Sequence, residues 1–317
     1  MHTRTRKKRS GGEHPPTRLR KTNCHPGTRK KKILDYSCFT KESILILKDA
    51  FNRHHPEKQI VTNNPTEIWA HLHQKIPECD RESCWLQKIP NRYLQDKLKK
   101  DLFSPVKPAE WKAKPNAWLS NFDIDVVIQQ YEEANRDFLF LGPTPIDFDE
   151  VKNGKCIWEE LCRINIVKEY RRGKRKFGVI FNLDTSDGPG THWVSLFMDI
   201  KDPTPFLFYF NSTAEETPIE VKDLMERLES QFKLIKPLKS RNLRVLENTK
   251  MQHQKSNTEC GMYSLFFIIS CLTRKTDPND MNDSKKMSVD ELVALFAGKT
   301  RIPDALVEKY RGIYFND

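Results

Sequence analysis

Residues 254–269 read QKSNTECGMYSLFFII. A polar loop turns here into an apolar run that predicts a buried helix, and Cys260 stands at the junction. The partial positive charge at a helix N-terminus stabilises a thiolate, so this position predicts a nucleophilic cysteine. A lone cysteine before a helix is more often a small buried hydrophobe, so the hypothesis also requires a base and a residue that orients the base.

His192 and Asn211 are candidates for these two groups. An apolar stretch, 193–200, follows His192, and a turn-rich segment separates it from a second apolar stretch, 206–210. This pattern predicts a β-hairpin in which His192 and Asn211 lie toward the open ends of neighbouring strands, within reach of each other. The register cannot be read from the sequence. Cys260, His192 and Asn211 together form a candidate catalytic triad.

The chain order His, Asn, Cys resembles the ubiquitin-like-protein protease family, which includes SUMO proteases and adenovirus protease. The loop DTSDGPGTHW at 184–193 and the block ECGMYS at 259–264 are most similar to the polyprotein-processing proteases of large nucleocytoplasmic DNA viruses, the African swine fever virus type. The resemblance covers roughly the second two-thirds of the chain. It implies an α+β, papain-like cysteine protease fold of the adenain and SUMO-protease type, with a central mixed sheet packed on the Cys260 helix.

The resemblance also implies a role for each site residue. Cys260 is the nucleophile, His192 is the general base and then the general acid, and Asn211 orients the imidazole. Gln254 forms the oxyanion hole with the backbone N–H of Cys260. Asn257 is a second candidate for a polar contact there. SUMO proteases usually have aspartate where Asn211 and Glu259 stand, and this departure favours the viral proteases.

Two tryptophans and an asparagine complete the predicted site. The segment 118–131 resembles the tryptophan-leucine signature of the family, which implies that Trp118 and Trp193 form the walls of a narrow substrate tunnel. Such a tunnel admits only glycines before the scissile bond, so the expected substrate sequence is Gly-Gly-X. Asn182, ten residues before His192, either faces the site or is an ordinary turn residue.

Three functions are considered. The leading one is a thiol endopeptidase that processes viral structural precursors at Gly-Gly-X during virion maturation, in the virion and host cytoplasm or in the nucleus. The second is a deconjugating isopeptidase for a SUMO-type modifier, which uses the same chemistry. The third, a non-catalytic nucleic-acid-binding virion protein, would require a missing catalytic residue, and none is missing. We expect no cofactor and no metal, and the oligomeric state stays open.

Residues 1–32 form a basic tail. They contain twelve Lys or Arg and one acidic residue, which accounts for the whole net charge of +11. We expect the tail to be disordered and to bind viral nucleic acid through its phosphates, or to target the nucleus through Arg6-Lys7-Lys8-Arg9. A solubilising tail is an equal alternative. Gly11-Gly12-Glu13 also fits the predicted cleavage rule and suggests self-trimming.

Residues 33–115 are predicted to form a helical arm domain, and residues 116–317 the catalytic domain. Apolar residues at helical spacing predict arm helices at 41–51 and 66–72, with Thr40 and Thr66 as N-caps. The spacing of the nearby histidines and cysteines, His71, His73, Cys79 and Cys84, matches no standard zinc site. Pro105, Pro108 and Pro115 lie in the boundary region.

The eight cysteines indicate the redox environment of the protein, and the hydropathy indicates whether the chain enters a membrane. The cysteines do not have the density of a disulfide-rich domain, and a catalytic thiol needs reducing surroundings, so we expect all eight to be reduced. The longest apolar run, about residues 265–271 with its flanks, is too short to span a bilayer. We therefore expect neither a membrane segment nor a signal peptide.

Overall fold

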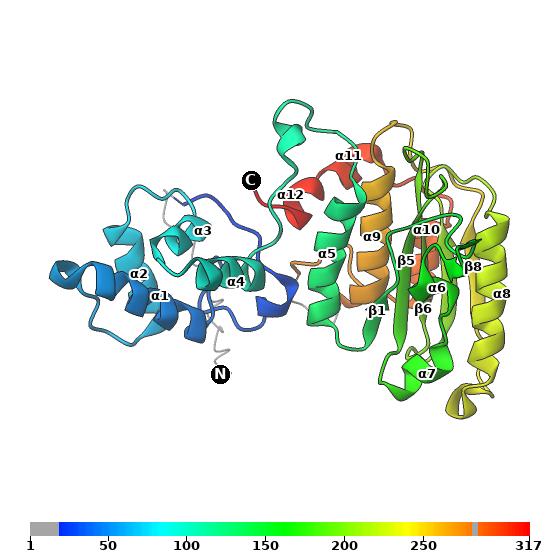
Figure 1. The fold of residues 1–317 in the computed structure, drawn as a ribbon, viewed down its shortest axis with the longest axis horizontal. Helices are drawn as coiled ribbons and strands as arrows, with labels where there is room; N and C mark the ends of the chain where they lie inside the picture. The colour runs from blue at the N-terminus through cyan, green and yellow to red at the C-terminus, as the bar shows by residue number, and fades with distance from the viewer. Residues whose placement is uncertain (1–18, 281–284) are drawn as a thin grey trace, which may run out of the picture. The chain divides into compact units, whose positions relative to one another are not determined.

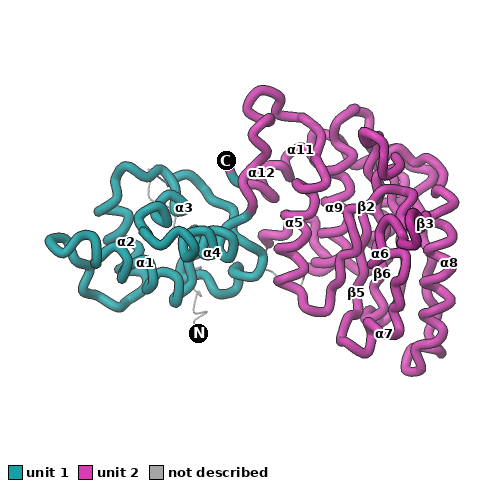
Figure 2. Tube along the Cα trace, viewed as in Figure 1, with its two compact units in different colours: residues 1–104, 316 teal, residues 105–315, 317 magenta. Residues whose placement is uncertain are grey.

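The computed structural model describes residues 19–280 and 285–317. The chain divides into two compact units, shown in Figure 2. Unit 1 extends to Ser104 and includes Asn316, and unit 2 comprises residues 105–315 and Asp317. The sequence placed the boundary between residues 115 and 116, whereas this division falls between Ser104 and Pro105, at the first of the three prolines in the boundary region.

Unit 1 is helical. Its elements are η1 (Pro26–Thr28), α1 (Lys41–His54), η2 (Pro56–Lys58), α2 (Pro65–Lys75), α3 (Glu82–Trp85), η3 (Leu86–Lys88) and α4 (Arg92–Leu102). Thr40 caps α1 as predicted, in a reciprocal capping box with Ser43. The predicted helix at 66–72 is confirmed as α2, but its predicted N-cap, Thr66, is wrong: the N-cap is Asn64, whose side chain accepts a hydrogen bond from the backbone N–H of Thr66. Pro65 occupies the first helical position, where a missing N–H costs nothing.

The expectation that all cysteines are reduced is wrong for six of them. Disulfides join Cys24 to Cys38, Cys79 to Cys84 and Cys156 to Cys162. The paired Cα atoms lie 5.1 to 6.3 Å apart, which a disulfide bridges without moving the backbone. The sequence reasoning considered only overall cysteine density and overlooked pairs only 5 or 6 residues apart. Among the described residues, Cys260 and Cys271 remain free thiols.

The predicted basic tail is described only from residue 19. The Arg6–Arg9 and Gly11-Gly12-Glu13 hypotheses therefore lie outside the described residues. Residues 19–32 do not conform to the prediction of a disordered tail. They contain η1, and bridges pair Cys24 with Phe103 and Lys32 with Thr40. The Cys24–Cys38 disulfide ties this stretch to the helical unit.

Unit 2 is an α+β domain built on one mixed sheet. Its elements are η4 (Ala109–Lys112), α5 (Asn121–Ala134), β1 (Phe138–Phe140), β2 (Thr144–Pro145), β3 (Val151–Lys152), β4 (Lys155–Cys156), α6 (Glu159–Cys162), α7 (Ile166–Arg171), β5 (Lys176–Asn182), β6 (Trp193–Asp199), β7 (Phe206–Phe210), α8 (Ile219–Lys233), η5 (Lys236–Leu238), β8 (Arg244–Asn248), α9 (Cys260–Thr273), α10 (Val289–Phe296), α11 (Asp304–Glu308) and α12 (Arg311–Tyr314). The sheet order is β1-β5-β6-β7-β8, with β2 also paired to β5. The predicted β6–β7 hairpin is confirmed, and Ser195 pairs with Phe210. β7 and β8 run parallel, which makes the sheet mixed.

Helices cover both faces of this sheet. Figure 1 shows α5 and α9 on one face and α8 on the other. Side chains alternate along the strands: Phe206, Phe208 and Phe210 of β7 pack with α9, and Leu207 and Tyr209 pack with α8. Both faces are therefore apolar, which explains the continuous hydrophobic runs of β6 and β7. No helix in the described residues is long and apolar enough to cross a membrane.

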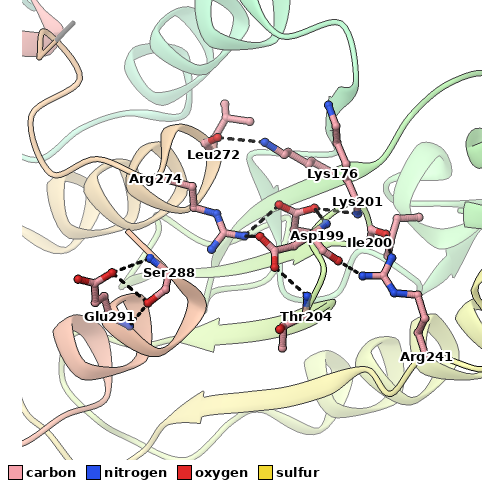
Figure 3. A network of polar contacts seen from close by, with 11 residues as sticks. Lys176, Asp199, Ile200, Lys201, Thr204, Arg241, Leu272, Arg274, Ser288 and Glu291 are labelled. Carbon is pink, nitrogen blue, oxygen red and sulfur yellow. Dashed lines mark hydrogen bonds and ion pairs between the residues drawn. The ribbon is translucent and has the colours of Figure 1, made fainter. Parts of the chain in front are cut away.

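The far end of α9 is held by a buried ionic network, drawn in Figure 3. Arg274, which ends α9 in a left-handed conformation, donates to Asp199 at 3.2 Å and to Asp202 at 2.8 Å. The side chains of Arg274 and Asp199 are 9% and 3% exposed, so their charges depend on each other. Asp199 also accepts the backbone N–H groups of Lys201 and Asp202, which shapes the turn between β6 and β7. The network therefore joins the hairpin to α9.

We predict that Asp199→Asn lowers the free energy of unfolding by about 2 kcal/mol, because the buried Arg274 loses one of its two carboxylate partners and keeps the other, Asp202. Asparagine keeps an oxygen for the turn N–H groups, so the change isolates the ionic contact. The midpoint of urea unfolding measures the effect. The matched control is Glu159→Gln, which removes the exposed pair with Arg163 and should change the free energy of unfolding by less than about 0.5 kcal/mol. Equal effects of the two variants would contradict the prediction.

Candidate active site

Cys260 is the first residue of α9 and is 1% exposed. Burial raises the pKa of the Cys260 thiol, although the backbone N–H groups of Trp193, Gly261 and Cys260 itself act in the opposite direction. The neighbouring Glu259 carboxylate raises the thiol pKa further. The backbone N–H groups at the helix start thus favour the thiolate, as the sequence predicts, while burial acts against it. The thiol must transfer its proton to a base when it attacks.

The base lies on the strand that touches the thiol. The backbone N–H of Trp193 faces the sulfur of Cys260 closely enough to lower the pKa of the thiol, and His192 directly precedes Trp193. His192 Nε2 lies 2.9 Å from Asn211 Oδ1. The structure therefore brings the three predicted triad residues to one end of the sheet.

The orientation of the Asn211 amide determines the tautomer of His192. Asn211 Oδ1 also accepts from the backbone N–H of Thr213 at 3.0 Å and from its hydroxyl at 2.8 Å, so the oxygen, not the nitrogen, faces these donors. His192 Nε2 must then carry a hydrogen and donate it to Asn211. Nδ1 is left as the acceptor for the thiol proton. Asn211 is fully buried.

Gln254 approaches the nucleophile from the polar loop before it. Its side chain is 4% exposed, so the amide is shielded from water. Gln254 Oε1 accepts from the hydroxyl of Ser212 at 2.7 Å, and Nε2 donates to the carbonyl of Ser256 at 2.7 Å. One N–H of Nε2 is not used by these contacts. An oxyanion hole beside the Cys260 N–H would require a side-chain donor of this kind.

Gly261 allows the first turn of α9 to approach the wall of the site. A Cβ at this position would lie 3.0 Å from Leu119 Cβ and 3.3 Å from Trp193 Cδ1. The indole N–H of Trp193 donates to the carbonyl of Leu119 at 3.1 Å, which joins β6 to the start of α5. Trp118 and Trp193 both line a cavity of about 640 Å³ on this side of the site.

The structure places the two secondary candidates differently. Asn182 lines the cavity, and its Oδ1 accepts the backbone N–H groups of Asp184 and Thr191, so it supports the loop that leads to His192. At Gly190, where φ is +90°, a Cβ would lie 2.8 Å from Asn182 Nδ2. Asn257 is exposed in a bend and forms no hydrogen bond with the described part of the chain.

Residues of the C-terminal segment (residues 296–311) hold the cysteine loop (residues 253–259) in place, and the sequence reasoning missed them. Arg311 donates to both carboxylate oxygens of Glu259 and to the carbonyl of Ala117, and it lies over the Trp111 ring. Asp304 accepts the backbone N–H of Lys255. These partners are about 50 residues apart in the chain, and no local signal in the sequence indicates them.

The arrangement of a buried thiol, an oriented imidazole and an amide donor at the end of a mixed sheet defines a papain-like cysteine protease. Residues 176–295 match the catalytic domain of the Ulp1 protease family. The cysteine protease of African swine fever virus is 32% identical over 222 residues, covering 63% of this chain and 80% of that protein. The chain belongs to the Ulp1 protease family and is a cysteine protease.

Two further comparisons agree with this assignment. A thiol protease of Acanthamoeba polyphaga mimivirus is 31% identical over 199 residues, covering 63% of this chain and 62% of that protein. The crystal structure of the African swine fever virus protease shares the fold, with a TM-score of 0.61 and 24% identity over 94% of this chain and 97% of that one. The predicted family and fold class are thus confirmed.

The four arm residues whose spacing matches no standard zinc site are not all free to bind a metal. Cys79 and Cys84, two of the four, are bonded to each other. In residues 19–280 and 285–317, no group of three or more His, Cys, Asp or Glu side chains is arranged to hold a metal ion.

A fully buried histidine, His253, lies at the start of the cysteine loop. Its Nδ1 accepts the N–H of Ile302 at 2.9 Å, so Nε2 carries the proton and donates to the carbonyl of Phe296 at 2.9 Å. Burial lowers the pKa of His253, the bond to Phe296 opposes this, and the Arg301 charge lowers it further. A second proton would have to point at the Ile302 N–H.

We predict that stability and activity fall together as the pH drops below about 6.5, the ordinary histidine pKa. The unfolded chain takes up a proton there and the native state resists it, so this contribution to stability is complete above that pH and is lost as the pH falls toward the lowered pKa of native His253. Urea unfolding between pH 7.5 and 5.5 should show a smaller pH dependence in His253→Gln. His71→Gln, at an exposed site on α2, is the control. Equal slopes in all three proteins would refute the role of His253.

Proposed function

We propose that this protease is a viral endopeptidase that cleaves structural precursor proteins after Gly-Gly during virion maturation. It acts in the virion and host cytoplasm, with the nucleus as a further location. The observation that carries the proposal is a pair of tryptophans that line one cavity. Trp118 and Trp193 line the same cavity, and Trp193 contacts the first turn of the Cys260 helix.

The cavity wall favours substrate residues without side chains. Trp193 is only 7% exposed and its indole is tied to Leu119, so it cannot move aside without losing that hydrogen bond. Trp118 is 43% exposed and lines the same cavity. A peptide that passes between these rings to reach Cys260 must be thin, which glycine satisfies best.

The steps of the proposed reaction follow from the orientation of the His192 imidazole and the Gln254 amide. The thiol proton passes to Nδ1 of His192, and the sulfur attacks the carbonyl carbon of the second glycine. The resulting oxyanion accepts from the Cys260 N–H and Gln254 Nε2. The imidazolium protonates the departing amine as the C–N bond breaks. A water, deprotonated by His192, then hydrolyses the thioester and releases the new carboxyl terminus and the free thiol.

Deconjugation of a ubiquitin-like modifier is the second candidate. Other African swine fever virus relatives carry the name SUMO-1 cysteine protease. The same tunnel would accept the Gly-Gly end of a modifier, and hydrolysis of an isopeptide bond needs the same residues. The two activities differ in whether a folded modifier adds affinity beyond the peptide.

We predict that the full-length protein cuts a peptide containing Gly-Gly-X after the second glycine. Replacing either glycine by alanine should lower kcat/KM at least about 100-fold, because a Cβ would meet an indole face. Cys260→Ala should abolish cleavage. Mass spectrometry of the products checks each point. If the Gly-Ala peptide is cut as fast as the Gly-Gly peptide, the tunnel hypothesis is wrong; if only a modifier fusion is cut, deconjugation replaces the leading proposal.

A nucleic-acid partner for the basic tail is part of the proposal. The described portion, residues 19–32, contributes six of the twelve tail cations, and the other six lie in residues 1–18. Their number supports binding to phosphates with release of counterions. Such binding would hold the protease near packaged precursors.

We predict that deletion of residues 1–18 weakens DNA binding at low salt at least about tenfold and flattens the dependence of log K on log salt concentration, because fewer counterions are released. Fluorescence anisotropy with a labelled duplex from 50 to 200 mM salt measures both quantities. Peptide cleavage in the absence of DNA, which should not change, is the control. An unchanged salt slope would assign DNA binding to another surface.

A further inference from the structure

Ser212 follows Asn211, the amide of the triad, and precedes Thr213, which donates to the oxygen of that amide. Ser212 is 1% exposed. Its hydroxyl donates to Gln254 Oε1 at 2.7 Å. Its carbonyl accepts the backbone N–H groups of His253 at 2.8 Å and Gln254 at 2.9 Å. One residue of the β7 end therefore contacts both the backbone and the side chain of the oxyanion glutamine, 42 positions away.

Two contacts hold the Gln254 amide in one orientation: the Ser256 carbonyl, which can only accept, bonds to Nε2, and the Ser212 hydroxyl donates to Oε1. The two ends of a primary amide have nearly the same shape but opposite hydrogen-bonding character. With Ser212 donating to Oε1, the oxygen is directed to the hydroxyl and Nε2 to the other side, where one N–H reaches Ser256. The second N–H is then available to an oxyanion. An amide turned around would present oxygen to a negative charge and would oppose the reaction.

We propose that Ser212 is a positioning residue of the protease reaction, which acts through Gln254 by holding its amide with the N–H toward the oxyanion. Ser212 itself does not touch the substrate. Asn211 and Ser212 thus share one function: Asn211 orients the imidazole that moves the proton, and Ser212 orients the amide that stabilises the charge. Two successive residues of one strand end align two separate elements of the site.

The role predicts a specific kinetic pattern. Ser212→Ala removes the donor to Oε1 and leaves the Gln254 amide held only by the Ser256 carbonyl, so kcat should fall about 10- to 100-fold with KM little changed, a part of the loss expected when an oxyanion donor is removed. In the Gln254→Ala background the same change should have little further effect, because no amide remains to be oriented. Alkylation of Cys260 by iodoacetamide forms no oxyanion, so its rate should not change in Ser212→Ala. This last readout separates positioning from damage to the thiol or the imidazole.

Ser270→Ala is the matched control. Ser270 is fully buried in α9, and its hydroxyl has no partner within the described part of the chain. Removing that hydroxyl should leave kcat unchanged. A loss of kcat in Ser270→Ala equal to that in Ser212→Ala would show that any buried serine is equally sensitive, and would overturn the proposal.

A second measurement does not depend on any substrate. In the NMR spectrum of the folded protein, the side-chain amide signals of Gln254, assigned by their loss in Gln254→Ala, should be protected from solvent exchange in the wild type and not in Ser212→Ala. Unchanged protection in Ser212→Ala, or loss of kcat that adds fully to that of Gln254→Ala, would overturn the role of Ser212. Only the choice of peptide rests on the Gly-Gly proposal. A wild type that leaves the peptide uncut would overturn that proposal, and the amide signals would still decide on Ser212.

Discussion

The close approach of the first turn of α9 to strand β6 is the constraint on which the active site depends. Gly261 has no side chain to hold the helix away, and the backbone N–H of Trp193 reaches the sulfur of Cys260. Because His192 precedes Trp193, this single contact also brings the base to the nucleophile. The far end of α9 is joined to the same strand by Arg274 and Asp199, so the helix is held against the hairpin at both ends.

The cysteine loop is held by the C-terminal segment through an ion pair with a buried carboxylate beside the nucleophile. A carboxylate at Glu259, 2% exposed and next to the nucleophile, raises the thiol pKa and would be costly without a partner. Arg311 supplies that partner with two charge-assisted hydrogen bonds, at 3.2 and 3.0 Å. The site therefore depends on the last helix of the domain, far from the residues that carry out the reaction.

The parts of the site that sequence reasoning predicted are those with a local pattern. A polar loop before an apolar run marks the Cys260 helix, and two apolar strands around a turn mark the hairpin that brings His192 and Asn211 together. The contacts of Ser212 with Gln254 and of Arg311 with Glu259 join positions 42 and 52 apart. They depend on how packed elements meet, and neither composition nor periodicity carries that information. The N-cap of α2 was missed for a local reason, since Thr66 and Asn64 are both good caps and Pro65 decides between them.

Asparagine at position 211 suits the electrostatics of this site. The residue is fully buried, and its Oδ1 serves three donors, His192 Nε2 and the N–H and hydroxyl of Thr213. An aspartate would hold the same donors but would add a permanent charge to an interior that already contains Glu259, and burial of a second carboxylate is expensive. A neutral acceptor orients the imidazole without that cost. Burial raises the pKa of the Cys260 thiol, so transfer of its proton gains from an imidazole that Asn211 already holds in place.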